Sequence, residues 1–156
     1  MKILIASVAS RSRNSSRKPA RNSPCDALVS LYLDRIAAYA PVESLTFSTE
    51  DALFLHVEKL RARTSPSVVL LDSRGKLLNS EDFAAWLARL KDSGRQQLVL
   101  AIGPASGWTG ARRAQAETLL SFSPMTLPHE LMKVVLAEQV YRAFTILTGH
   151  PYHSGH

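Results

Sequence analysis

The chain of 156 residues contains a single cysteine and no long apolar run. With Cys25 alone, no disulfide can form within the chain, and nothing indicates an oxidising compartment. No segment approaches the roughly 20 apolar residues of a membrane-spanning helix. The N-terminal run MKILIASVAS is too short for a convincing signal peptide, and basic residues follow it at once. These absences predict a cytoplasmic protein that does not enter a membrane.

The usual motifs of nucleophilic catalysis are also missing. There is no GxSxG sequence, no conspicuous pair of carboxylates and no obvious partner for Cys25. The segment GPASGW at 103–108 matches neither a P-loop nor a dinucleotide-binding fingerprint. His150, His153 and His156 lie beyond the end of the last predicted helix without an acidic residue nearby, which disfavours a metal site.

The composition is that of an ordinary globular protein, with 46% apolar and 21% charged residues. The length predicts one domain over residues 1–156. A net charge of +6 favours an anionic partner such as nucleic acid, but a small protein can also be basic merely for solubility. Charge alone leaves both explanations open.

Apolar runs alternate with amphipathic segments along the chain, which predicts an α/β fold. Strands are expected at 2–8, 42–47, 67–72, 97–102 and 118–123, and helices at about 24–40, 50–63, 80–92, 110–117 and 128–148. The central strand runs lack strict alternation, as expected when both faces of a strand are buried. The order predicts a parallel sheet with helices on both faces.

A long polar link at 9–23 joins the first strand to the first helix. It contains five basic residues and no acid: Arg11, Arg13, Arg17, Lys18 and Arg21. Such links usually have roughly 2 to 6 residues. Its length, charge and serine content predict an arm that binds RNA phosphates, and the alternative is a solvated loop without a ligand.

Ligands of open α/β sheets bind beyond the carboxyl ends of the strands. The loops at 73–79, 103–109 and 124–128 are therefore the candidate binding loops. The last helix has more apolar surface than one core-facing stripe requires, which predicts contact with its own sheet and with a second subunit. Arg142 follows Glu138 by four residues, so a helical ion pair is its simplest role. Tyr152 and His153 in the tail suit stacking on a base and hydrogen bonding to it.

The C-terminal motifs resemble those of a known family. These are IGxxxG from Ile102, SFSPMTLPHELMKVVLAEQVYRAFTI from Ser121 and HPYH from His150, with looser similarity in MKILIASV and VVLLDSRGK. In this order they are similar to the ribosomal RNA large subunit methyltransferase H family of the SPOUT class. The similarity extends over the whole chain, with no separate RNA-binding extension.

The resemblance implies a C-terminal trefoil knot, a homodimer and S-adenosylmethionine as cofactor. It further implies methylation of N3 of a pseudouridine in helix 69 of 23S rRNA, on assembled ribosomes. The implied cofactor-binding residues are Leu71, Gly103, Phe122, Ser123, Pro124, Met125, Thr126 and Leu127. The implied catalytic residues are Tyr152 and His153, which orient the base or assist proton loss, and Arg142, which contacts phosphate or the cofactor carboxylate.

Two positions depart from the family pattern. Pro104 replaces a glycine and removes an N–H donor from its loop, and Ser154 stands where an arginine usually follows HPYH. They keep an alternative open, a noncatalytic knotted protein that binds ribosomes or assists their assembly. A flavodoxin-like small-molecule binding domain is a third interpretation, but it would need neither the tail nor the two-sided last helix.

Overall fold

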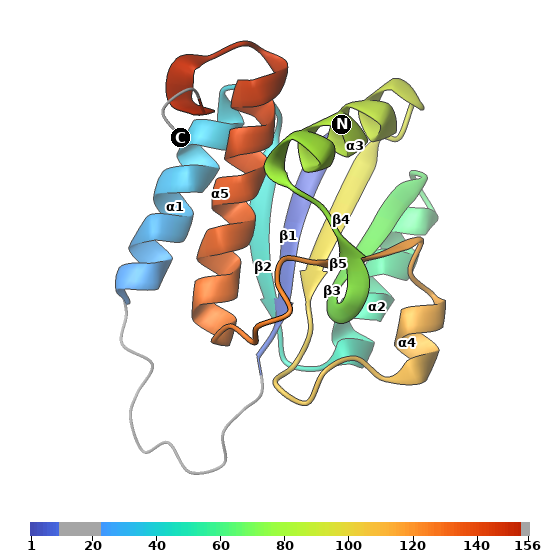
Figure 1. The fold of residues 1–156 in the computed structure, drawn as a ribbon. Helices are drawn as coiled ribbons and strands as arrows, with labels where there is room; N and C mark the ends of the chain where they lie inside the picture. Colours follow the sequence, from blue (N-terminus) through green and yellow to red (C-terminus); the bar gives the residue numbers. More distant parts are fainter. Residues whose placement is uncertain (10–22, 154–156) are drawn as a thin grey trace.

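The computed structural model of the chain describes residues 1–9 and 23–153. Strands and helices alternate along the chain, and the five strands form one parallel sheet in the order β2-β1-β4-β3-β5 (Figure 1). The predicted α/β class with a parallel sheet is confirmed. The strands are β1 (Lys2–Val8), β2 (Val42–Phe47), β3 (Pro66–Leu77), β4 (Gln97–Ile102) and β5 (Thr118–Ser121). The helices are α1 (Pro24–Ala37), α2 (Glu50–Arg61), α3 (Ser80–Asp92), α4 (Gly110–Ala114) and α5 (His129–Leu147), followed by the 3-10 turn η1 (Pro151–His153).

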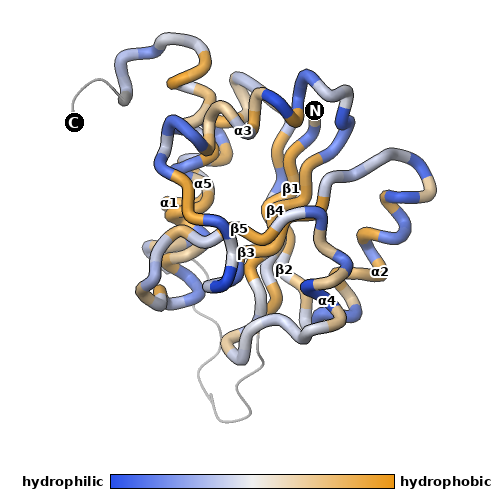
Figure 2. The backbone as a smooth tube through the Cα atoms, turned by 45° about the vertical axis from the view of Figure 1, so that its right-hand side comes forward, coloured by the Kyte–Doolittle hydropathy of each residue, from blue (hydrophilic) through white to orange (hydrophobic). Residues whose placement is uncertain are grey.

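Two apolar cores lie on opposite faces of the sheet. In β1, Ile3 and Ile5 belong to the core beneath α1, α3 and α5, whereas Leu4 and Ala6 belong to the core beneath α2. Successive side chains of a strand point to opposite faces, so this strand contributes to both cores. Figure 2 shows the hydrophobic colouring concentrated along the central strands. Burial on both faces explains why their sequences lack an alternating pattern.

The helix starts follow local capping chemistry. Ser23 accepts a hydrogen bond from the amide of Asp26 and forms a capping box with it, and Pro24 occupies the first helical position. At α3, Asn79 is the cap, and Ser80 is the first helical residue. No helix in residues 1–9 and 23–153 combines the length and apolarity needed to cross a bilayer.

Strand β3 is longer than predicted. The prediction of a binding loop at 73–79 was wrong, because β3 continues to Leu77. Its register with β5 shifts between Leu71 and Lys76, so that Leu71 and Lys76 both align with Leu120. A Cβ added to Gly75 would lie 2.4 Å from the backbone carbon of Leu120. This close approach requires glycine at position 75. The residues around Gly75 are mostly polar, so their sequence did not indicate that the strand continues.

Helix α5 packs beside α1 and against α3 (Figure 1). Its buried residues include Leu136, Val140 and Phe144, and the Phe144 ring stacks on Tyr39 at 5.5 Å between centroids. Leu131 and other apolar side chains of α5 remain partly or fully exposed. One predicted face of the helix is therefore buried in its own chain, and contact of the other with a second subunit stays a prediction.

Candidate active site

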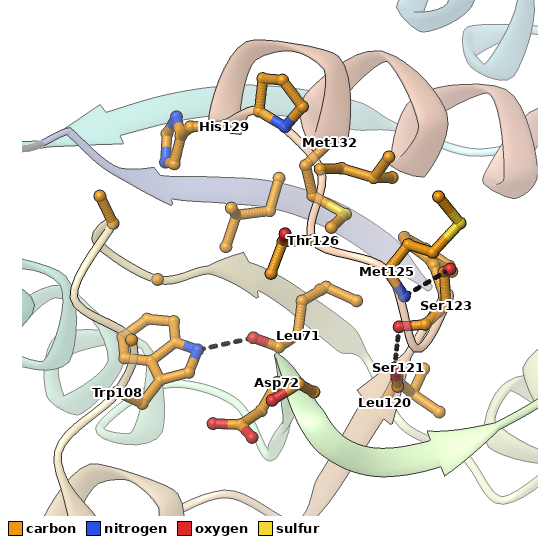
Figure 3. A pocket seen from close by; sticks show the side chains of 18 of the residues that line it. Leu71, Asp72, Trp108, Leu120, Ser121, Ser123, Met125, Thr126, His129 and Met132 are labelled. Atoms are coloured by element: carbon orange, nitrogen blue, oxygen red, sulfur yellow. Dashed lines mark hydrogen bonds between the residues drawn. The ribbon is translucent and has the colours of Figure 1, made fainter.

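A cavity of about 380 Å³ lies at the carboxyl ends of β4 and β5, beside the point where the buried part of β3 ends (Figure 3). This is the edge where ligands bind in open α/β sheets. Its volume falls within the roughly 300 to 1,000 Å³ of small-molecule pockets. Three segments supply most of its lining: residues 71–73 within β3, the loop at 102–108 and the loop at 120–129. The predicted ligand edge and two of the three predicted loops thus meet in one cavity.

Most of the predicted cofactor-binding residues gather in this cavity. Those that line it are Leu71, Gly103, Phe122, Ser123, Met125, Thr126 and Leu127. Pro124 is exposed and does not belong to the lining. Their role in binding a cofactor stays a prediction.

The loop after β5 is folded back by local hydrogen bonds. The Ser121 hydroxyl donates to the Ser123 carbonyl at 3.1 Å, and the Met125 amide donates to the Ser123 hydroxyl at 2.9 Å (Figure 3). These local hydrogen bonds begin at Ser121, the last residue of β5. Met125 is 76% exposed at the rim of the cavity, so it can contact a ligand without first leaving a packed core.

Trp108 forms part of the cavity wall, and the sequence did not single it out. It is 4% exposed, and its Nε1–H donates to the Leu71 carbonyl at 2.9 Å. Its indole occupies the space in front of Gly103, where an added Cβ would lie 2.8 Å from the Trp108 Cε2 atom. Gly103 therefore serves the packing of Trp108 as well as lining the cavity. Only the tertiary structure showed that Trp108 is the residue that packs against Gly103.

Asp72 is another lining residue that the sequence motifs did not indicate. Its side chain is 7% exposed, and it accepts a hydrogen bond from the Arg74 amide at 2.9 Å. Arg113 of α4 lies 3.5 Å from its Oδ2 atom. The only available signal was the position of Asp72 directly after the apolar run of β3.

His129 lines the opposite side of the cavity, at the start of α5. Its Nε2 atom is buried and has no hydrogen-bond partner among the described residues. Burial lowers the pKa of His129, and the positive charge of Lys133 adds to the lowering, although the Val8 carbonyl and Glu130 oppose it. The neutral imidazole is therefore favoured over the charged form at this place.

The predicted catalytic residues lie at the other end of α5. Arg142 donates from Nε to Oε1 of Glu138 at 2.9 Å, and its Nη2 lies 2.8 Å from the same oxygen, which confirms the helical ion pair. The Arg142 guanidinium also lies 5.3 Å from the ring centroid of Tyr152. The hydrogen bond to Glu138 is the main cause that raises the pKa of Arg142.

Tyr152 belongs to the same cluster. Its hydroxyl donates to Glu138 Oε1 at 3.3 Å and lies 3.5 Å from the Tyr32 hydroxyl. Burial, together with the Tyr32 hydrogen bond and the Glu138 charge, raises the pKa of Tyr152. The phenol therefore stays protonated and acts as a hydrogen-bond donor. Tyr32 and Glu138 were not predicted as site residues, because only the tertiary fold brings α1 and η1 together.

The structure does not bring this cluster into the cavity. Met132 in the cavity wall and Arg142 are ten residues apart on α5, which corresponds to about 15 Å along the helix axis. Arg142 instead lines a neighbouring hollow of about 440 Å³, which shares only Phe122 with the cavity. His153 lies in η1, and the predicted RNA-binding residues between 11 and 21 lie outside the described residues, as does Ser154.

Comparisons with known proteins decide the family. A family model described as "Predicted SPOUT methyltransferase" matches residues 1–153. The ribosomal RNA large subunit methyltransferase H of Koribacter versatilis is 46% identical over 87% of this chain and 92% of its own length. The protein of the same name from Allorhizobium ampelinum is 41% identical over 81% of this chain and 88% of its own length. The chain belongs to the SPOUT methyltransferases, in the large subunit methyltransferase H family.

Solved structures of SPOUT-type methyltransferases have the same fold. The SpoU methyltransferase AviRb from Streptomyces viridochromogenes, in complex with AdoMet, matches with a TM-score of 0.50 and 14% identity. The match covers 92% of this chain and 60% of the AviRb chain. For this member of the SPOUT family, the cavity at the carboxyl ends of β4 and β5 is accordingly the candidate active site.

Proposed function

We propose that this protein uses S-adenosylmethionine to methylate N3 of a pseudouridine in helix 69 of 23S rRNA. The observation that carries the proposal is the cavity at the carboxyl edge of the sheet, lined by the folded-back loop after β5 in a chain of this family. The relatives' names supply the rRNA part of the proposal, because they are methyltransferases of the large ribosomal subunit RNA. Such a substrate also implies a cytoplasmic protein.

The residues of the cavity fit the cofactor. An adenosine moiety needs apolar surface and main-chain hydrogen bonds, and Leu71, Leu120 and Phe122 offer apolar surface beside a turn rich in hydroxyl and amide groups. Asp72 supplies a carboxylate that suits a cationic ligand. S-adenosylmethionine would contribute a methyl group that its sulfonium already activates. The protein then needs mainly to align the two reactants and to accept the proton of the ring nitrogen.

The Arg142, Glu138 and Tyr152 cluster is the proposed site for the RNA base. Arg142 neutralises a phosphate or carboxylate, and the Tyr152 hydroxyl orients the base together with His153. Within one subunit, this cluster and the cavity lie at different ends of α5. We therefore propose a homodimer in which the tail of one subunit completes the cavity of the other. The partly exposed apolar residues of α5 support such a contact.

The electrostatic balance supports an RNA substrate. The net charge of +6 attracts phosphates, and the basic residues between 11 and 21 are the proposed contacts with 23S rRNA. The C-terminal trefoil knot stays an expectation of family membership.

Pro104 is the observation that favours a second candidate, the noncatalytic ribosome-binding protein. It lines the cavity but has no N–H, and its carbonyl accepts a hydrogen bond from the Gly107 amide at 2.8 Å. The carbonyl keeps a second lone pair for a ligand, but the loop lacks one N–H donor, which would weaken cofactor binding.

One experiment separates the two candidates. Assembled ribosomes that lack the modification are incubated with the protein and labelled S-adenosylmethionine, and mass spectrometry locates the methyl group. The proposed enzyme places the label on the helix 69 pseudouridine. Folded protein that binds ribosomes without transferring the label would instead be the noncatalytic candidate.

Mixed dimers test the shared site. A Met125→Ala subunit carries an altered cavity loop, and a His153→Ala subunit carries an altered tail. If each site combines both subunits, mixing the two inactive variants restores one intact site per mixed dimer. Activity that stays at the level of the separate variants would contradict a shared site.

A further inference from the structure

Two neighbouring arginines of α4 have different partners. Arg113 donates from Nη1 to the Trp108 carbonyl and lies 3.5 Å from Asp72, so it contacts two residues that line the cavity. Arg112 instead pairs with Asp51 and lies 4.4 Å from the centroid of the Phe54 ring, both on α2. Neither of those α2 residues lines the cavity. The same helix thus provides one arginine directed to the cavity wall and one matched arginine directed away from it.

The Arg113 contacts join two separate parts of that wall. Asp72 follows the buried part of β3, whereas Trp108 belongs to the loop after β4. A second link between the same two parts is the hydrogen bond from the Trp108 indole to the Leu71 carbonyl. Trp108 is therefore held at its ring by β3 and at its backbone by Arg113. Helix α4 itself has no buried residue, so these contacts, rather than core packing, orient Arg113.

The charge pair lies in a sheltered place. The Asp72 side chain is 7% exposed and that of Arg113 is 23% exposed. A carboxylate at this depth needs compensation, and its other contact is the Arg74 amide at 2.9 Å. Removing the guanidinium would leave Asp72 with less compensation and the Trp108 carbonyl without this donor. Of these links between the loop at 103–109 and β3, only the hydrogen bond from the Trp108 indole would then remain.

We propose that Arg113 is a positioning residue of the cofactor site. It holds Trp108 and Asp72 in the wall, so that the loop at 103–109 already has its binding conformation before the ligand arrives. This inference rests on the proposed function, because the ligand concerned is S-adenosylmethionine. A preformed wall strengthens binding because the loop loses less conformational entropy when the ligand binds. Arg113 need not touch the ligand itself.

Calorimetric titration of the full-length protein with S-adenosylmethionine gives the first test. We expect Arg113→Met to weaken binding about tenfold, because a hydrogen-bonded charge that orders the wall is lost. Arg113→Lys should restore part of the affinity, since an ammonium can still pair with Asp72 but has no planar fork to reach both partners. Arg112→Met, which removes an arginine of similar exposure whose partners on α2 lie outside the cavity, should bind as the wild type does. Equal affinity of Arg113→Met and wild type would overturn the inference.

The second measurement needs no cofactor. The chain has two tryptophans, so a Trp86→Phe background leaves Trp108 as the only reporter of indole fluorescence. We expect Arg113→Met to make Trp108 more accessible to acrylamide quenching and Arg112→Met to leave it shielded. An unchanged quenching constant in folded Arg113→Met would overturn the positioning role.

The two measurements separate the inference from the proposed function. Wild-type protein that binds no S-adenosylmethionine would contradict the function, while the quenching experiment would still decide whether Arg113 positions Trp108. Wild-type protein that binds it, with Arg113→Met binding equally well, would contradict the inference alone. If Arg113→Met does not fold, Arg113→Gln, which also lacks the charge, takes its place in both measurements with the same criteria.

Discussion

Gly103→Ala should destabilise the protein by pushing Trp108 away from its hydrogen-bond acceptor. The added Cβ would lie 2.8 Å from Trp108 Cε2, whereas carbon atoms in contact prefer about 3.5 to 4.0 Å. The indole must therefore shift by about 0.7 Å or the backbone must yield. A shift of this size along the bond would lengthen the 2.9 Å contact from Nε1 to the Leu71 carbonyl beyond hydrogen-bonding distance.

The expected cost combines two effects. Overpacking a well-packed site costs about 1 to 3 kcal/mol, and leaving a buried donor unpaired costs about 1 to 3 kcal/mol. Because the shift relieves part of the overpacking, we expect a loss of about 2 to 4 kcal/mol in the free energy of unfolding. Gly107→Ala in the same loop is the matched control. Its Cβ would meet nothing within 4 Å, so only its positive φ of 78° matters, at about 1 to 2 kcal/mol.

Urea unfolding of four proteins tests this reasoning: wild type, Gly103→Ala, Trp108→Leu and the double variant. Leucine removes the atoms that the new methyl group would meet, so Gly103→Ala should cost far less in the Trp108→Leu background than in the wild-type protein. The two substitutions should therefore be non-additive by about 1 kcal/mol or more. Additive effects, or a Gly103→Ala variant as stable as the wild type, would refute the steric argument.

Three further substitutions probe other parts of the molecule. Gly75→Ala should cost more than about 2 kcal/mol by urea unfolding, because its Cβ would meet the Leu120 backbone, which cannot rotate away; a smaller loss would contradict the close approach of β3 to β5. Glu138→Gln should lower kcat with little change in the KM for S-adenosylmethionine, since it weakens the hold on Arg142 without altering the cavity, and a raised KM alone would argue against this separation. The pKa of His129 is lowered in the folded protein. As the pH falls through about 6.5, this imidazole therefore gains a proton in the unfolded chain before it does in the folded one, and protonation favours unfolding. The stability difference between wild type and His129→Gln should therefore shrink or reverse between about pH 7.5 and pH 5.5 and stay constant at higher pH, and a pH-independent difference would contradict it.

The fold was largely predictable because its signals are local. The apolar runs of β1 and β4 can be buried only in a central position, and Ser23 followed by Pro24 directly before an amphipathic segment indicates a helix start. The extension of β3 beyond Asp72 was not predictable in this way. It depends on the shifted pairing with β5, and its own residues are mostly exposed and polar.

The candidate site was likewise predictable only in part. Sequence motifs predicted that Gly103 and the loop after β5 bind one ligand, and both line the cavity. They did not identify Trp108 or Arg113, whose partners lie 37 and 41 positions away in the chain. Nor did they reveal that Tyr32 reaches Tyr152, at a separation of 120 residues.

By itself, the sequence determined the alternation of strands and helices, the burial of the central strands, the capping of the first helix and the similarity to one methyltransferase family. Hydrophobic patterns and caps act over a few residues, so they can be recognised without coordinates. Only the tertiary structure decided which side chains form the cavity wall, that Gly103 accommodates Trp108, and that Arg113 rather than Arg112 is directed to that wall. These contacts depend on strand order and register, which bring together atoms that no local pattern relates.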